Sequence, residues 1–478
     1  MKRKLLSVIL FFYITSAYSQ EGPFASFITD STMNHAVISF CVKDAESGAT
    51  VFENKPGTSL IPGSVLKIIT SAVALEMLGP DHTFKTIIGY SGKFSPGSGE
   101  LNGNIIIKGG GDPVLGSENF NEHYKGFAEK WVAAINKTEI KRINGQVITD
   151  DSYFDYMPVP SKWLWEDAGN YYGAGAYGLS VFDNTYFIRF NTKDNSRPPL
   201  ITAIFPEECR YELANRLTAS GKQDKGFVFA APYTETGSLE GIIPEGSEDF
   251  ILKAAIPDPP LLMARIIDSK LRNAGIRISG KPTTARMTQI PPTGFTAVNE
   301  ITSPLLKDII RILNHESVNL YAEHLVKELG RTFHDNGSTQ EGLSVIMNFL
   351  KEKDILSGGL FMEDGSGLSP LNAVSSEQIV EILRYMKKES PYYDDFIASF
   401  PDPGKEGTMR NYFRDPLFSN TLKAKSGSMT RVRGYAGYLT TLSGRNLVFC
   451  ILVNNYSGPS RTLVSNIEEI LKDIITNG

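Results

Sequence analysis

The sequence lacks three features that would each point to a particular class of protein. No apolar run reaches the roughly 18 residues that a membrane-spanning helix requires. Three cysteines, Cys41, Cys209 and Cys450, are too few for a disulfide framework, and we interpret Cys41 and Cys450, which lie in apolar runs, as small buried hydrophobic residues. Lys and Arg number 48 against 53 Asp and Glu, which excludes the broad basic surface of a nucleic-acid-binding protein. We therefore expect no nucleic-acid partner and no stable membrane anchor.

The composition that is present is that of a globular protein, with 41% hydrophobic and 21% charged residues. The length of 478 residues indicates about three domains or one domain with a large insertion. The six histidines show no metal-ligand spacing, so neither a metal nor another cofactor is expected.

The first residues have the pattern of a secretory signal. Lys2, Arg3 and Lys4 precede an apolar run from Leu5 to about Ala17, which is too short for a membrane anchor. We predict a signal peptide at residues 1–19 and export to the periplasm. The alternative is an N-terminal membrane helix. No cysteine follows the cleavage point, so a lipoprotein anchor is not expected.

Both ends of the chain show regular patterns that predict one α/β (α+β) domain. An apolar helix is predicted from Ser64 to Leu78, closed by Gly79, and its continuous apolar character places it at the centre of a domain. Strands are predicted at 36–42, 50–52, 422–429, 434–441 and 446–454, and helices at 305–315, 320–329 and 463–475. The last strand is apolar throughout, so we expect helices on both faces of its sheet.

Between these ends, the texture from 84 to 291 changes to short strands separated by Gly, Pro and Asn clusters, with few long helical patterns. We expect segments 20–84 and 292–478 to form the main domain, 85–105 and 185–291 a β-rich inserted domain, and 106–184 a nested one.

The predicted central helix opens on Ser64-Val65-Leu66-Lys67. Residues three apart share a helix face, so the Ser64 hydroxyl and the Lys67 amine are expected within hydrogen-bond reach. Burial and a second cation nearby would lower the pKa of Lys67 enough for it to accept a proton near neutral pH. Alone, this spacing is common by chance, and a surface Ser and Lys pair would explain it.

Two further motifs make chance a poor explanation. Ser317-Val318-Asn319 lies in the break between two predicted helices, and Lys425-Ser426-Gly427 lies on a predicted strand. Together with Ser64 and Lys67, they resemble the Ser-x-x-Lys, Ser-Asp-Asn and Lys-Thr-Gly set of penicillin-binding proteins and class A β-lactamases, with Val318 and Ser426 as departures.

Five segments, two of which extend the motifs above, narrow this resemblance to one family. A long insertion between the first two motifs is also typical of that family. The segments are Gly110–Pro113, Ser317–Glu323, Asp364–Ser369, Gly407–Met409 and Lys425–Met429. They are similar to those of the D-Ala-D-Ala carboxypeptidase/endopeptidase family, the class C low-molecular-mass penicillin-binding proteins. The resemblance implies a β-lactamase/DD-peptidase-like domain with an antiparallel five-stranded sheet flanked by helices.

The resemblance also implies roles for the residues of the three motifs. Ser64 would be the acylated nucleophile and Lys67 its general base. Ser317 would relay a proton toward the leaving amine, and Asn319 would hold Lys67 or the substrate amide. Lys425 and Ser426 would bind the terminal carboxylate of D-Ala.

The remaining implied sites concern the substrate. The backbone N–H groups of Ser64 and Ser428 would form an oxyanion hole. Ser428 follows Lys425, Ser426 and Gly427 on the same predicted strand. Leu368, Met429 and aromatic residues of the 163–172 stretch would line a pocket for the peptide side chain, with Glu166 or Asp167 facing an ammonium. Pro370 stands where relatives carry an arginine, and plain core packing is the alternative for Trp163 and Trp165.

From these residues we predict a serine DD-peptidase that acts on peptidoglycan stem peptides through an acyl-enzyme and that β-lactams acylate. Two alternatives stay open. One is a β-lactamase or esterase on the same fold. The other is a wall-binding protein without catalysis. The sequence also does not distinguish carboxypeptidase from endopeptidase activity, because both activities cleave next to a D-residue.

Overall fold

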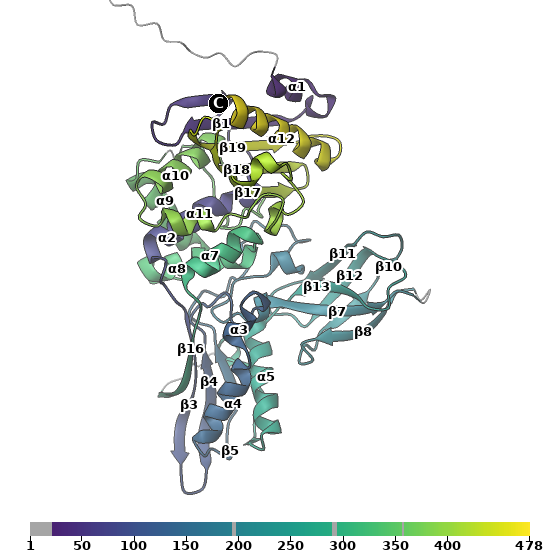
Figure 1. The fold of residues 1–478 in the computed structure, drawn as a ribbon. Coiled ribbons are helices and arrows are strands. Elements are labelled where there is room, and N and C mark those ends of the chain that lie inside the picture. The colour runs from purple at the N-terminus through teal and green to yellow at the C-terminus, as the bar shows by residue number, and fades with distance from the viewer. Residues whose placement is uncertain (1–21, 194–196, 289–293, 356–357) are drawn as a thin grey trace, which may run out of the picture.

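The computed structural model describes residues 22–193, 197–288, 294–355 and 358–478. The expected signal peptide at 1–19 lies outside the described residues, as does the expected boundary at 292. Figure 1 shows a main body built from both ends of the chain, from which two smaller parts project. None of the described helices is both long and apolar enough to cross a membrane.

A five-stranded antiparallel sheet lies at the centre of the main body, in the order β17-β18-β19-β1-β2. Its strands are β1 (Val37–Asp44), β2 (Thr50–Asn54), β17 (Leu422–Met429), β18 (Val432–Thr440) and β19 (Asn446–Asn454). β1 pairs with β19 along its whole length, so backbone hydrogen bonds join the two ends of the chain. The predicted fold class is confirmed.

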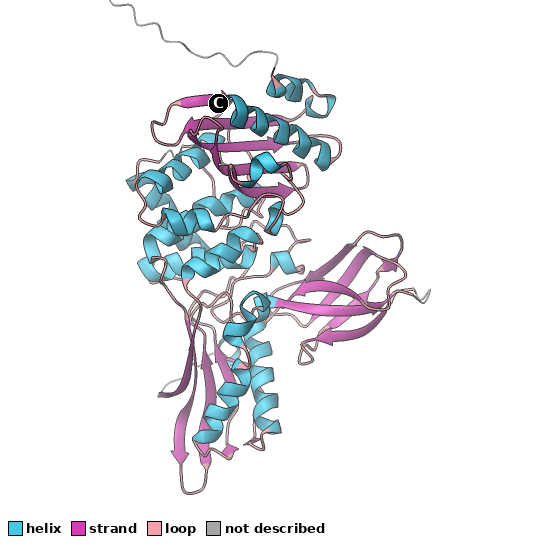
Figure 2. Ribbon diagram, viewed as in Figure 1, coloured by secondary structure: helices cyan, strands magenta, loops and turns pink. Residues whose placement is uncertain are grey.

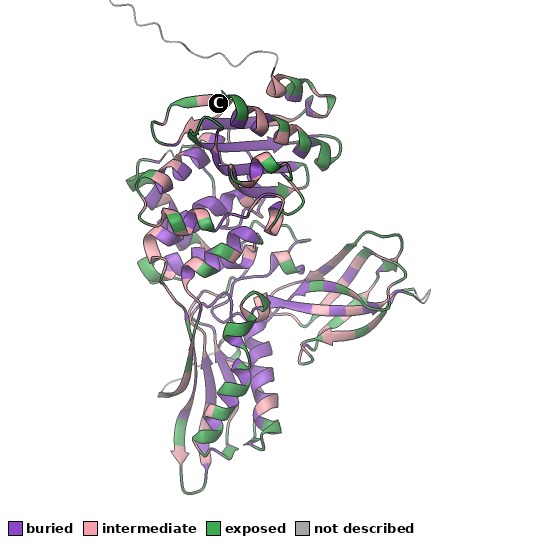
Figure 3. Ribbon diagram, viewed as in Figure 1, coloured by how far each residue is buried: buried purple, intermediate pink, exposed green. Residues whose placement is uncertain are grey.

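Helices cover both faces of this sheet, as the apolar last strand predicted (Figure 2). Along β19, Phe449 and Ile451 share a core with the terminal helix α12 (Ser460–Asn477) and with α1 (Pro23–Thr29). Cys450 and Leu452 belong to the core on the opposite face. The helices of that face are α2 (Lys67–Leu78), α7 (Leu306–His315), α8 (Asn319–His334), α9 (Thr339–Glu352), α10 (Ser376–Lys388) and α11 (Tyr393–Ala398). Successive side chains of a strand point to opposite faces, which is why every residue of β19 after the first is buried (Figure 3).

Helix α2 is the buried centre of this layer, as predicted. A 3₁₀ turn from Gly63 to Leu66 precedes it, so Ser64 lies in the turn that leads into the helix. All its residues from Lys67 to Leu75 are buried. Gly79 ends the helix with a φ of +82°, a conformation that glycine adopts without steric cost.

Helix α8 continues past Gly330, where the sequence predicted its end, to His334. A Cβ at position 330 would lie 2.8 Å from the backbone nitrogen of Gly342 in α9. Gly330 therefore permits close packing of two helices and does not stop one. Asp335, with a φ of +53°, terminates the helix.

The described residues of the insertion form three further sheets. One holds β3 (Lys85–Ser95), β4 (Glu100–Lys108), β5 (Arg142–Ile143), β6 (Val147–Asp150), β14 (Arg277–Ile278), β15 (Thr283–Thr284) and β16 (Phe295–Thr302). A second holds β7 (Thr185–Asn191), β8 (Leu200–Phe205) and β13 (Phe250–Ala255), and a third β9 (Glu212–Asn215), β10 (Thr218–Ala219), β11 (Lys225–Ala230) and β12 (Thr236–Ile243). Residues of the second and third sheets share one hydrophobic core.

The strand pairing groups the insertion differently from the expected division at 85–105, 106–184 and 185–291. Strands β5 and β6, expected in the nested part, pair in parallel with β4. The segment 185–255 instead forms sheets of its own. A parallel partner is reached by a crossover, here through α3 (Asn121–Tyr124) and α4 (Phe127–Lys137), and a crossover leaves no local turn signal in the sequence. We therefore propose that the nested folding unit of the insertion is the segment 185–255.

The short helix α6 (Ala285–Thr288) and the long helix α5 (Pro259–Asn273) lie in this region. The prediction of a β-rich insertion missed α5. Helix α5 begins with Pro259 and Pro260, and consecutive prolines are more typical of a loop. In the structure they occupy the first helical turn, where a missing N–H costs nothing. Asp258 caps the turn by accepting from the Leu261 N–H at 3.0 Å.

The double cover of β19 predicts a large stability cost for truncation there. Leu452→Ala removes a side chain with no exposure and should lower the free energy of unfolding by about 2–5 kcal/mol. Leu442→Ala is the matched control, because Leu442 is 64% exposed, and should change it by less than about 0.5 kcal/mol. Denaturant unfolding of the whole protein measures both. Equal losses would contradict the packing described.

Candidate active site

The turn before α2 places Ser64 and Lys67 side by side. Lys67 Nζ lies 2.9 Å from Ser64 Oγ, as the spacing of three residues predicted. Gly427 of β17 packs against this turn, because a Cβ at position 427 would lie 2.5 Å from the Pro62 carbonyl oxygen. The same Cβ would lie 3.1 Å from the Ser64 nitrogen, so the strand and the turn touch through their backbones. Any side chain at 427 would force them apart.

Lys67 has no exposed surface and makes two further hydrogen bonds. It donates to Asn319 Oδ1 at 2.6 Å and to the Ser366 carbonyl oxygen at 2.7 Å. Burial lowers the pKa of Lys67 to about 7, although the nearby carboxylates Asp364 and Glu323 oppose that shift. An amine with this pKa exchanges its proton readily at neutral pH.

Ser317 and Lys425 form a second pair beside the first. Lys425 Nζ donates to Ser317 Oγ at 2.9 Å and to the Ser426 carbonyl oxygen at 2.9 Å. Burial, with a smaller contribution from the charge of Lys67, holds the pKa of Lys425 well below its usual value. Ser317 has a φ of +59°, so the break between α7 and α8 holds it in a conformation that is costly for a serine.

Asn319 joins the two pairs to the insertion. It is the first residue of α8, its Oδ1 accepts from Lys67, and its Nδ2 donates to the Tyr172 carbonyl oxygen at 2.8 Å. The structure therefore brings together Ser64, Lys67, Ser317, Asn319 and Lys425, the residues of the three predicted motifs.

Thr408 is a site residue for which the sequence analysis proposed no role. Its hydroxyl lies 2.8 Å from that of Ser426, which donates to it. Two neighbouring hydroxyls beside a lysine suit the two oxygens of a carboxylate. The signal was present in the family-like segment Gly407–Met409, but only the fold shows that this segment meets β17.

Two buried carboxylates also escaped the sequence analysis, although they lie in family-like segments. Glu323 of α8 accepts from the N–H groups of Gly365 and Ser366, at 3.1 and 2.8 Å. Burial raises the pKa of Glu323. Because the carbonyl oxygen of the same Ser366 accepts from Lys67, Glu323 fixes the residue that holds the lysine.

Asp364 organises the rest of this loop. Its carboxylate accepts from the N–H groups of Gly367 and Ser369, at 2.8 and 2.6 Å, and from Asn372 Nδ2 at 2.8 Å. Trp163 Nε1 donates to it at 2.7 Å. Trp163 is thus a buried support of the loop, in agreement with the packing alternative, whereas Trp165 is 59% exposed and does not fit that alternative.

The other residues expected to line a side-chain pocket lie in different surroundings. Leu368 and Met429 are half-buried and adjoin Gly367 and Ser428, which both lie against Gly63. Glu166 is exposed, whereas Asp167 is buried beside Tyr172, with its pKa raised by burial. Whether these residues bind a peptide side chain stays a prediction.

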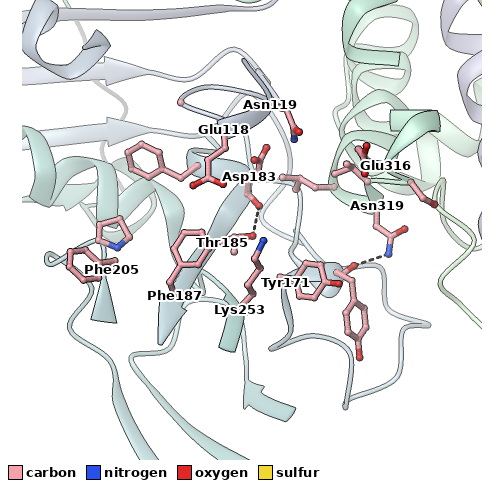
Figure 4. A pocket seen from close by; sticks show the side chains of 17 residues that line it. Glu118, Asn119, Tyr171, Asp183, Thr185, Phe187, Phe205, Lys253, Glu316 and Asn319 are labelled. Atoms are coloured by element: carbon pink, nitrogen blue, oxygen red, sulfur yellow. Dashed lines mark hydrogen bonds between the residues drawn. The ribbon is translucent and has the colours of Figure 1, made fainter. Parts of the chain in front are cut away.

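A cavity of about 720 Å³ opens beside Ser317 and Asn319 (Figure 4). The loop before α8 forms one wall, and strands β7 and β13 of the insertion form the other. A site formed by the main body alone would lack this second wall.

Residues 21–474 match the D-Ala-D-Ala carboxypeptidase 3 (S13) family. The chain is 27% identical over 454 residues to a D-alanyl-D-alanine carboxypeptidase of Actinomadura sp. (strain R39), covering 92% of this chain and 81% of the relative. It is 24% identical over 434 residues to D-alanyl-D-alanine carboxypeptidase DacB of Haemophilus influenzae, covering 88% and 86%.

A solved structure gives the same result for the fold. The crystal structure of penicillin binding protein 4 (dacB) from Haemophilus influenzae matches with a TM-score of 0.80 at 22% identity, covering 93% of this chain and 97% of that one. The family match spans nearly the whole chain and agrees with the predicted resemblance. The chain therefore belongs to the D-Ala-D-Ala carboxypeptidase 3 (S13) family, a family of serine carboxypeptidases.

Proposed function

We propose that the protein cleaves D-Ala-D-Ala termini of peptidoglycan stem peptides through an acyl-enzyme on Ser64. The observation that carries the proposal is the 2.9 Å contact between Ser64 Oγ and a fully buried Lys67 whose pKa is about 7. A lysine that is partly neutral at physiological pH accepts the serine proton as Oγ bonds to the carbonyl carbon of the penultimate D-Ala.

The second pair then serves the leaving group. The peptide C–N bond breaks, and Ser317 Oγ donates a proton to the nitrogen, which departs as the amine of the terminal D-Ala. Lys425, which donates to Ser317 at 2.9 Å and stays charged, polarises the Ser317 hydroxyl, and the proton that Lys67 took from Ser64 returns to Ser317. Lys67, neutral again, then takes a proton from water as the water oxygen bonds to the ester carbon, and it gives that proton to Ser64 Oγ as the ester C–O bond breaks.

The substrate carboxylate is placed by Lys425, Ser426 and Thr408. A bound carboxylate would raise the lowered pKa of Lys425 and keep the lysine charged. The N–H groups of Ser64 and Ser428 are proposed to bind the developing oxyanion, since the strand at Gly427 lies against the Ser64 turn. Asn319 would hold the substrate amide while it holds Lys67.

We further propose that the enzyme is exported, that β-lactams acylate Ser64, and that cross-linked peptides are cleaved as well. A structure of the Haemophilus influenzae relative complexed with a β-lactam supports the second point. The signal-like residues 1–19 support the first. Fractionation of cells that express the full chain tests export.

Labelled penicillin followed by intact mass measurement tests the proposal. The protein should gain one stable adduct, and Ser64→Ala should abolish it. Ser98→Ala, at an exposed turn of the insertion, is the control and should keep the adduct. Release of D-Ala from a pentapeptide should follow the same pattern.

Other outcomes would support the alternatives. Rapid turnover of the drug without a lasting adduct would favour a β-lactamase. Neither adduct nor turnover, in a folded protein, would leave only a wall-binding role.

Glu323→Gln tests whether the buried carboxylate positions Lys67. The amide offers one acceptor oxygen in place of two, which weakens the hold on the N–H groups of Gly365 and Ser366, so the acylation rate should fall about tenfold. The ionised form of Glu323 raises the pKa of Lys67, so its loss should move the rising limb of the pH–rate profile to lower pH.

Glu328→Gln is the matched control for this prediction, because Glu328 is a buried acid of the same helix that contacts Tyr153 instead. Any loss of stability in the control is measured separately, and its pH–rate profile should not move. A profile that is the same in both variants would contradict a positioning role for Glu323.

A further inference from the structure

The cavity beside the site is larger than a terminal D-Ala requires. Its volume is about 720 Å³, and it extends from Ser317 and Asn319 to Phe187, Phe205 and Lys253 of the insertion. In Figure 4 the labelled side chains of the two walls face the same space.

A second cavity of about 500 Å³ continues the first. The two share Tyr171, Tyr172 and Lys253 as lining residues, and the second extends to Asp224 and Lys225 at the start of β11. Together they form a groove from the proton-relay serine onto the sheets of the insertion. A groove of this size suits an extended ligand and is larger than a single amino acid needs.

Lys253 is an available cation at the junction of the two cavities. Its side chain is exposed, and its Nζ lies 5.7 Å from the centre of the Phe187 ring. Within the described ranges, no carboxylate forms an ion pair with it: the nearby Asp183 accepts from Tyr321 and Ser117 instead.

The rest of the lining is mixed in character. Tyr171 and Phe205 expose 53% and 41% of their surfaces, and Glu118 and Glu316 add negative charge at the edge. Exposed aromatic rings beside both signs of charge match a peptide that carries carboxylates and an amine.

We propose that this groove binds the second stem peptide of a cross-linked substrate, with Lys253 paired to a free carboxylate of that peptide. The inference rests on the proposed function. When a cross-link is cut, the leaving amine belongs to a second peptide, and Ser317, which serves that amine, borders the groove. The D-Ala released from an uncross-linked peptide is a single residue, which a groove of two joined cavities greatly exceeds.

Lys253→Met tests the inference, because Met keeps an aliphatic contact with Phe187 and removes only the charge. For a sugar-free cross-linked peptide dimer, KM should rise about three- to tenfold while kcat stays within about twofold. For an uncross-linked pentapeptide, and for acylation by penicillin, the variant should match the unchanged enzyme. Lys253→Arg should restore most of the affinity for the dimer.

Lys222→Met is the matched control, since Lys222 is an exposed lysine of the insertion that lines neither cavity. It should leave all three reactions unchanged. An unchanged KM for the dimer in Lys253→Met would overturn the inference. So would an effect seen only with disaccharide-bearing dimers, which would assign the groove to the glycan.

Failure of the proposed function gives a different result. An enzyme that releases D-Ala and binds penicillin but leaves the dimer intact would refute only the second-peptide groove. An enzyme without adduct or D-Ala release would refute the function and the inference together.

Discussion

A lysine amine with no exposure to water is the constraint on which the rest of the site depends. A charged lysine without partners would cost free energy at that depth. Burial therefore favours the neutral form of Lys67 and lowers its pKa. The protein offsets part of this cost with Asn319 and the Ser366 carbonyl, which hold the nitrogen at 2.6 and 2.7 Å. What remains is an amine aimed at Ser64 that is able to take its proton.

Segments that are distant in the chain meet around this lysine, and the sheet explains how. β1 and β19 join the two chain ends, β17 brings Lys425 and Gly427 to the turn of Ser64, and α8 brings Asn319 and Glu323. The insertion leaves the main body after α2 and returns before α7. Residues of its strands line one cavity with Ser317.

The sequence allowed prediction of those features that are set locally. The pair of Ser64 and Lys67 follows from helical spacing, and the double-sided cover of β19 follows from its apolar run. Glu323 and Asp364 could not be predicted in their roles, because their partners are backbone N–H groups of a loop whose course only tertiary packing determines. For the same reason the sequence did not predict the hydrogen bond from Trp163 to Asp364. Helix α5 was missed because it begins with two prolines, which a helix tolerates only in its first turn.

The most direct test of the account is the rate constant for acylation of Ser64 by a penicillin, measured by intact mass between about pH 5 and pH 9. Lys67 must lose a proton to act as the base, so the rate should rise with pH and level off around its pKa of about 7. A rate that continues to increase tenfold per pH unit up to pH 9 would place the base near the ordinary pKa of lysine. That result would contradict the central role given to the burial of Lys67.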